Sequence, residues 1–384
     1  MPLKSFGDRA RGVRLERMRD SPLWLRKPTG EGEVREGFRN LHPMRTGLRD
    51  PQAPRPTLGE FLCGGARRVP NAPLPAIDPR EAWHRAPGNG LRATWLGHST
   101  VLIEVHDGQR VVRLLTDPVW GLRASPSQLV GPKRFQPVPV ALKALPPIDA
   151  VLLSHDHYDH LCMHTVRQLA KTRVPFITSL GVGAHLEAFG VAPERITELD
   201  WWQSHRLPAS EVEVTAAPSQ HFSGRGLKDR NATLWSSLVV RTPRHRIFFS
   251  GDTGLTNQYT EIRQRLGPFD LVMLEVGAFH PSWGDIHLGP ENALEALAML
   301  GGGAFLPVHW GTFSLALHEW DAPAETLLRL APQRGVHLLM PQLGEAVEPA
   351  RDSSVTPWWR RVEQREVGPI EPMSWPKAMP FPLD

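Results

Sequence analysis

The chain has 384 residues, of which 41% are hydrophobic and 22% are charged, as expected for a globular protein with a sizeable core. Its two cysteines, Cys63 and Cys162, are too few for a disulfide scaffold or a multi-cysteine zinc ribbon. The net charge is +4, but residues 1–90 hold 17 Lys and Arg against 10 Asp and Glu. This basic segment could be a solvated extension, or it could meet a phosphate-bearing partner.

Hydropathy gives an expectation about location. No uncharged apolar run reaches the roughly 18 residues of a membrane helix, and the first 20 residues lack the apolar centre of a signal peptide. We therefore expect a cytoplasmic protein and leave peripheral contact with a membrane open.

The chain divides into three predicted parts. Residues 1–90 form a basic arm rich in Pro and Gly, and its stretch 51–79 is expected to wrap the body with short helical turns. Residues 91–345 form the catalytic domain, and residues 346–384 form a C-terminal tail packed on the surface.

Short apolar runs with β-branched or aromatic residues predict buried strands in the catalytic domain. In chain order they lie at 94–97, 101–105, 111–115, 150–153, 174–177, 237–240, 246–249, 271–274 and 304–307. A helical pattern follows at 290–300, where Pro290 suits the first turn. Hairpins followed by mixed strands and helices predict packed sheets with helices outside.

The segment 151–161, ValLeuLeuSerHisAspHisTyrAspHisLeu, carries the chemistry. It places His155, His157, Asp159 and His160 just after an apolar run. Alternate residues of an extended turn project the same way, so His155 and His157 can bind one ion while Asp159 and His160 point toward another.

Three further residues follow apolar runs in the same way, namely His221, Asp252 and His309. Such positions converge on one rim of a sheet scaffold. Five imidazoles and two carboxylates suit zinc and also iron or manganese, and seven ligands are enough for two ions. Two zinc ions that share a bridging hydroxide would hydrolyse a substrate without a protein nucleophile. The proton of the attacking water would pass to Asp159 or Asp252.

The motifs HisAspHisTyrAspHis, GlyAspThrGly (251–254) and HisTrpGlyThrPhe (309–313) resemble the metallo-β-lactamase fold superfamily. The sequence motifs that flank them are similar to those of N-acyl phosphatidylethanolamine-hydrolysing phospholipase D and its bacterial relatives. They are TrpLeuGlyHisSerThr at 95–100, LeuLeuThrAspPro at 114–118, GlyProLysArgPhe at 131–135, GlnHisPheSerGlyArg at 220–225 and AsnAlaThrLeuTrp at 231–235.

The resemblance implies an α/β fold, the αββα sandwich of two mixed sheets flanked by helices, with two zinc ions. It implies that one ion is held by His155, His157 and His221, the other by Asp159, His160 and His309, and that Asp252 bridges them. It also implies phospholipase D activity on N-acyl phosphatidylethanolamine-like lipids and a homodimer.

Two substrate-binding residues follow from the resemblance as well. The positions that contact the lipid headgroup match Tyr158 and His287. This chain has Ile286 where the family has glutamine, so the headgroup preference is open.

Alternatives remain at this level. One alternative is a soluble lactonase or small phosphoester hydrolase of the ascorbate-6-phosphate lactonase type, which shares the GlyHisSerThr-like motif. A nuclease is disfavoured because residues 91–345 are not basic, so we expect no nucleic-acid partner. A binding protein that has lost its chemistry is disfavoured because all seven ligand positions carry competent residues.

Other residues allow two interpretations each. Asp117 fits an orienting role better than a catalytic one, and His98 is expected near the rim of the site. Arg225 lies in a basic loop that is either solvated or steers an anionic substrate. The tryptophan pairs 201–202 and 358–359 suit core packing better than a membrane interface.

Overall fold

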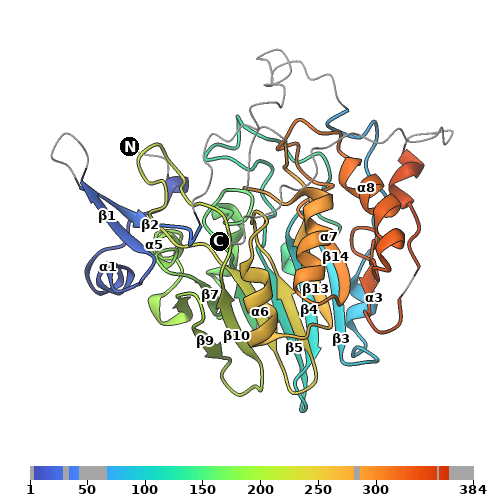
Figure 1. Cartoon of the computed structure of the whole chain (residues 1–384), viewed down its shortest axis with the longest axis horizontal. Helices are drawn as coiled ribbons and strands as arrows, with labels where there is room; N and C mark the ends of the chain where they lie inside the picture. Colours follow the sequence, from blue (N-terminus) through green and yellow to red (C-terminus); the bar gives the residue numbers. More distant parts are fainter. Residues whose placement is uncertain (1–3, 29–33, 43–66, 281–285, 353, 363–384) are drawn as a thin grey trace.

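A computed structural model describes residues 4–28, 34–42, 67–280, 286–352 and 354–362. Two mixed β-sheets lie face to face with helices on both outer sides (Figure 1). The first sheet has the order β15 (Ala346–Val347), β3 (Leu91–Gly97), β4 (Thr100–His106), β5 (Val111–Thr116), β6 (Ala150–Leu152), β7 (Phe176–Ser179) and β8 (Ile196–Leu199). The second has the order β14 (Ala304–Val308), β13 (Leu271–Glu275), β12 (Arg246–Phe249), β11 (Ser237–Arg241), β10 (Glu213–Ala217) and β9 (Ser204–Arg206).

All nine predicted strands are confirmed, with ends shifted by up to a few residues, and the predicted helix is α7 (Gly289–Met299). The αββα sandwich is therefore the observed architecture. Strands β3, β4 and β5 form an antiparallel meander, whereas β5–β6–β7–β8 and β12–β13–β14 are parallel.

The alternation of side chains along each strand builds the layers. In β6, Ala150 and Leu152 join the core between the sheets, whereas Val151 joins a second cluster on the outer face. Helices α4 (Met163–Leu169) and α5 (Gly183–Ala188) supply the other side of that second cluster. Helices α6 (Gln258–Leu266), α7 and α8 (Ala322–Leu330) cover the second sheet.

The described part of the N-terminal segment packs against the body of the protein. It comprises η1 (Lys4–Phe6), α1 (Gly12–Arg19) and a hairpin of β1 (Trp24–Pro28) and β2 (Val34–Phe38), followed after residue 66 by α3 (Arg80–Trp83). Met18, Leu23 and Phe38 share an apolar cluster with residues of the body. Arg14 pairs with Glu198 at 2.6 Å and Glu187 at 2.6 Å. Residues 43–66, most of the predicted wrapping stretch, lie outside the described residues.

The C-terminal segment also joins the body. Strand β15 extends the first sheet by pairing with β3. In η6 (Trp358–Val362), Trp358 and Trp359 are fully buried in the main core, beside the stacked rings of Trp95 and Trp310. The core-packing interpretation of this tryptophan pair is therefore confirmed. Short 3₁₀ turns lie at η2 (Leu142–Ala144), η3 (Pro193–Arg195) and η5 (Pro332–Arg334).

Across the ranges that the structure describes, every helix is too short or too polar to cross a bilayer.

Candidate metal centre

The candidate ligands gather at one edge of the sandwich. His155, Asp252 and His309 follow β6, β12 and β14, and His221 follows β10. Because parallel strands end at the same edge of a sheet, the loops after them meet there. The two facing sheets therefore contribute ligands to a single site.

One group joins His155, His157 and His221 with Asp252, with one ligand atom from each within 4.8 Å of the others. His157 Nδ1 lies 2.9 Å from His155 Nε2 and 3.2 Å from His221 Nε2. Asp252 Oδ2 lies 3.7 Å from Nε2 of both His155 and His221. Three imidazole nitrogens thus face one point.

A second group joins Asp159, His160 and His309 with His98. Asp159 Oδ2 lies 3.2 Å from His309 Nε2 and 3.0 Å from His98 Nε2. Asp252 reaches this group too, with Oδ2 at 3.1 Å from His160 Nε2 and Oδ1 at 3.1 Å from His309 Nε2. The structure therefore brings all seven predicted ligands together, with Asp252 between the two groups.

The donor atoms fit metal ions. Zinc bonds of about 2.0–2.1 Å place tetrahedral ligand atoms roughly 3.3 Å apart, close to the separations within both groups. His160 Nε2 and Asp252 Oδ1 are buried without a satisfactory hydrogen bond among the described residues, an arrangement that is costly unless another partner binds them. Imidazole and carboxylate donors suit zinc, iron or manganese.

The protonation states also suit ligation. Burial holds the pKa of the His155 and His221 imidazoles well below the ordinary value, so these rings stay neutral. Burial alone would raise the pKa of the Asp252 carboxyl, but His160 and His309 lower it well below its usual range. Neutral imidazoles and an ionised carboxylate are the forms that bind a metal. Burial alone would lower the pKa of the His160 and His309 imidazoles, but Asp252 and Asp159 raise it above the ordinary value, so these two rings must release a proton when a metal binds.

The backbone at this edge is unusual. His98, Asp117 and His309 have φ values of 52°, 32° and 65°, which side chains other than glycine adopt rarely. At Gly251, with φ of 55°, a Cβ would lie 2.5 Å from Ser154 Cβ, so a residue with a side chain before Asp252 would collide with the loop that holds His155. Strained backbone of this kind concentrates at functional sites.

Asp117 orients a candidate ligand, as its position predicted. Its Oδ2 accepts hydrogen bonds from His160 Nδ1 at 2.7 Å and from Ser154 Oγ at 2.6 Å, while Oδ1 accepts one from Ser154 N at 2.8 Å. The bond to Nδ1 leaves His160 Nε2 to face the centre, which is how carboxylates commonly fix a metal-binding histidine.

The two predicted substrate-binding residues have different neighbours. The Tyr158 hydroxyl donates to the Arg225 carbonyl at 2.6 Å. The His287 ring lies 5.2 Å from that of His221 and 5.3 Å from that of His309. Its Nδ1 lies 3.1 Å from Oε1 of Glu275, a fully buried carboxylate at the end of β13. The His287 ring therefore lies beside two candidate ligands, whereas Tyr158 contacts Arg225.

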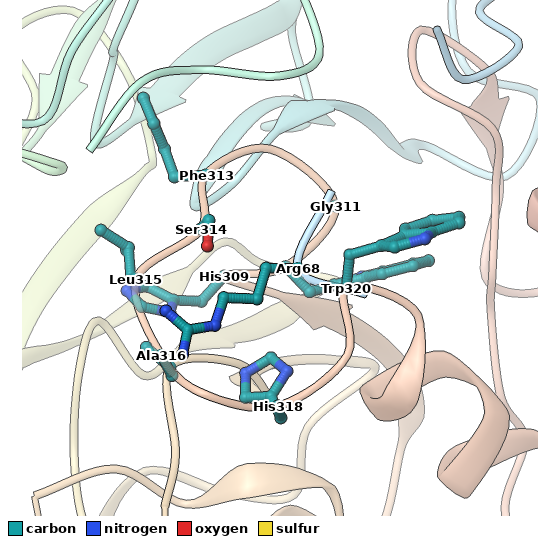
Figure 2. A pocket seen from close by; sticks show the side chains of 11 residues that line it. Arg68, His309, Gly311, Phe313, Ser314, Leu315, Ala316, His318 and Trp320 are labelled. Atoms are coloured by element: carbon teal, nitrogen blue, oxygen red, sulfur yellow. The ribbon is translucent and has the colours of Figure 1, made fainter. Parts of the chain in front are cut away.

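A pocket opens beside His309 (Figure 2). The Arg68 side chain extends across it, above His318. The other lining residues are Ala278, Trp310, Gly311, Phe313, Ser314, Leu315, Ala316 and Trp320. The pocket thus places an arginine among both polar and apolar side chains, next to a candidate ligand.

Sequence reasoning underestimated His98 and did not find Glu275 or Arg68. His98 was expected only near the rim, yet it is buried and in contact with Asp159. Glu275 carried a signal that could have been used, since it is an acidic residue at the end of an apolar strand, like Asp252. Arg68 carried no such signal, because it is some 240 positions from His309 in the sequence and only folding brings the two together.

The sandwich and the histidine–aspartate cluster at its edge define a protein of the metallo-hydrolase type. The model of the beta-lactamase superfamily domain matches residues 112–310. The chain therefore belongs to the beta-lactamase superfamily.

Several relatives are similar over much of the chain. An uncharacterized protein of Mycobacterium tuberculosis is 46% identical over 84% of this chain and 86% of its own length. The N-acyl-phosphatidylethanolamine-hydrolyzing phospholipase D 1 of Caenorhabditis elegans is 36% identical over 60% of this chain and 67% of its own. Among solved structures, an isothiocyanate hydrolase from Delia radicum gut bacteria superposes with a TM-score of 0.52 at 21% identity, over 67% of this chain and 98% of its own. The last comparison supports the fold alone.

Proposed function

We propose that this protein is a dinuclear zinc phosphodiesterase that cleaves N-acyl phosphatidylethanolamine-like lipids in the manner of a phospholipase D. The observation that carries the proposal is the set of seven imidazole and carboxylate ligands, which Asp252 joins into one centre. The homologue from Caenorhabditis elegans supports the substrate class. In this proposal the first ion is held by His155, His157 and His221, the second by Asp159, His160 and His309, and both by Asp252.

When bound, the two ions would supply an activated water and would stabilise negative charge on the phosphoryl group. The protein supplies the rest. In this proposal the proton of the attacking water passes to Asp159, whose Oδ2 lies within 3.2 Å of the His309 and His98 imidazoles. Asp252 is the alternative acceptor, because it lies at the junction of both groups.

In this proposal two side chains bind the phosphate of the substrate, His287 and Arg68. Glu275 accepts a hydrogen bond from His287 Nδ1, which turns the other ring nitrogen away from Glu275 and leaves it available to an oxygen of the substrate. Arg68 brings a cation to the pocket beside His309. A guanidinium can bind two phosphate oxygens at once. Tyr158 keeps its proposed role in headgroup contact.

Exposed apolar residues support contact with a bilayer. Leu129 and Leu227 are almost entirely exposed, and their loops are joined through Ser5, which donates to the Pro126 carbonyl and accepts from Arg225. Exposed leucines, one of them next to Lys228 in the chain, suit an anionic lipid surface.

The decisive experiment is to incubate the zinc-loaded protein with N-acyl phosphatidylethanolamine vesicles and to follow both products by mass spectrometry. We expect phosphatidic acid and N-acylethanolamine in equal amounts, and we expect both to disappear on chelation. If two bound ions are found but neither product forms, the lipid substrate is wrong, and a soluble phosphoester or lactone becomes the substrate to test. If no metal binds, the dinuclear centre itself is wrong.

A further inference from the structure

The N-terminal segment reaches the candidate metal centre at its end. Past β2, the Phe38 amide donates to the Asn231 carbonyl at 2.8 Å, and Asn231 Nδ2 donates to the Phe38 carbonyl at 3.1 Å. These bonds fix the segment along the loop that follows His221. The next residues of the segment are therefore held beside a candidate ligand that is some 180 positions away in the sequence.

Asn40 binds the backbone of His221 on both sides. Its Nδ2 donates to the His221 carbonyl at 2.7 Å, and its Oδ1 accepts from the His221 amide at 3.1 Å. Oδ1 also accepts from Trp235 Nε1 at 3.2 Å. An asparagine side chain carries the same donor and acceptor as a peptide group, so Asn40 pairs with His221 as a neighbouring strand would.

His221 needs such a partner because it lies four residues beyond the end of β10 and is buried. Among the residues that the structure describes, its two peptide groups bond to Asn40 alone. Buried peptide groups without a partner are costly. The position of this residue therefore depends on the asparagine.

The imidazole of His221 is fixed separately. Its Nδ1 lies 2.9 Å from the Ile286 carbonyl, so Nδ1 carries the proton and Nε2 faces His157 and Asp252. This contact sets the direction of the ring, whereas Asn40 sets the place from which the ring projects. Metal ligands must be held to within about 0.5 Å of their working position.

We propose that Asn40 is a positioning residue for the metal centre, and that the N-terminal segment thereby forms part of the site. This inference rests on the proposed metal-binding role of His221. It concerns metal affinity and does not depend on which substrate the enzyme hydrolyses.

The test measures zinc affinity by competition with a chromophoric chelator for the wild-type protein and the variants Asn40→Ala and Asn40→Ser. The matched control is Arg14→Met, which removes a contact of the same segment with α5 and β8, away from the centre. Thermal unfolding of each metal-free protein is recorded in parallel, so that a loss of stability is separated from a loss of affinity.

We expect Asn40→Ala to weaken one zinc equivalent by about tenfold or more and to leave the other close to the wild-type value. The serine hydroxyl of Asn40→Ser can bond one of the two peptide groups. The zinc affinity of this variant should therefore lie between those of the wild-type protein and Asn40→Ala, and it should keep the fold if the alanine variant does not. Arg14→Met should lower the unfolding temperature without changing either affinity. Wild-type affinities in folded Asn40→Ala or Asn40→Ser protein would overturn the inference. A wild-type protein that binds no zinc would instead overturn the proposed centre.

Discussion

Asp252 differs from the other candidate ligands because its carboxylate reaches both groups. We predict that Asp252→Asn lowers kcat/KM of the metal-loaded protein by about 100-fold or more, since an amide cannot offer two charged oxygens to two ions. Asp270→Asn is the control, because this carboxylate accepts a hydrogen bond from the Arg246 amide at the opposite end of β13. Steady-state kinetics together with metal analysis of both variants would test this prediction. Full turnover by Asp252→Asn with two bound ions would contradict the two-metal mechanism.

Arg68 and Arg67 are adjacent in the chain but lie in different surroundings. Arg67 pairs with Glu319 at 3.0 Å and Asp321 at 3.3 Å, whereas Arg68 lines the pocket beside His309. We predict that Arg68→Met raises KM roughly tenfold or more, because a charged hydrogen bond contributes about 1.5–3 kcal/mol. Arg67→Met should lower stability and leave KM unchanged, and equal effects of both variants on KM would refute the role of Arg68.

The candidate ligands could be recognised in the sequence because metal binding needs few residue types at short spacings. Four of the seven occur within six positions, from His155 to His160. The residues that hold the ligands are harder to find, because any polar side chain can serve. Nothing local marks Asn40 as a partner of His221, and only the folded chain brings the two together.

At the scale of elements, strands were predicted better than loops. A buried strand is marked by its own apolar residues, whereas the path of a loop depends on distant contacts. Arg225 illustrates the difference. As part of a basic loop it was expected to be solvated or to steer the substrate, but it is buried and packs over the Tyr158 ring at 4.0 Å. Both interpretations of this residue are therefore wrong.

The buried guanidinium of Arg225 joins η1 to the loop that carries the histidine motif. It donates to the Ser5 carbonyl at 2.8 and 3.0 Å, to the Leu161 carbonyl at 3.0 Å, and to the Asp156 carbonyl. We predict that Arg225→Met costs about 2–4 kcal/mol of unfolding free energy, because these carbonyls lose their donors in a buried place. Arg225→Lys should recover only part of it, since an ammonium lacks the planar fork. Urea unfolding would measure both, and a methionine variant as stable as wild type would refute the structural role.

At the scale of the whole molecule, the superfamily motifs predicted the sandwich, because these histidine–aspartate loop motifs are typical of a single fold. The N-terminal and C-terminal segments contain no such motifs. The hairpin of β1 and β2 and the burial of Trp358 and Trp359 follow from surfaces that the sandwich offers once it is folded. They could therefore not be derived from local patterns.

Acid should destabilise the whole fold through a half-buried neutral histidine, His318. Burial lowers the pKa of His318 from 6.5 to about 4, so between these pH values the unfolded chain binds more protons than the folded one. The stability that this residue contributes is therefore complete above pH 6.5 and is lost as pH falls toward 4, by up to about 3 kcal/mol. In His318→Asn, the unfolding free energy of the metal-free protein should fall less steeply across this window. Parallel curves for the two proteins would contradict the assignment.

The pairing of Asn40 with His221 has a consequence for biosynthesis. The two residues are separated by 181 positions, and a ribosome that adds about 5–20 residues per second needs roughly 10 to 35 seconds to travel from one to the other. During this interval the apolar side of the N-terminal hairpin lacks part of the surface that covers it, because Leu234 and Trp235 of the shared cluster follow His221 in the chain. A two-stranded hairpin is marginally stable alone. His309 emerges later still. The metal centre can therefore be assembled only after His309 has been translated, and chaperones have time to bind the segment that precedes Asn40 before its docking site is complete.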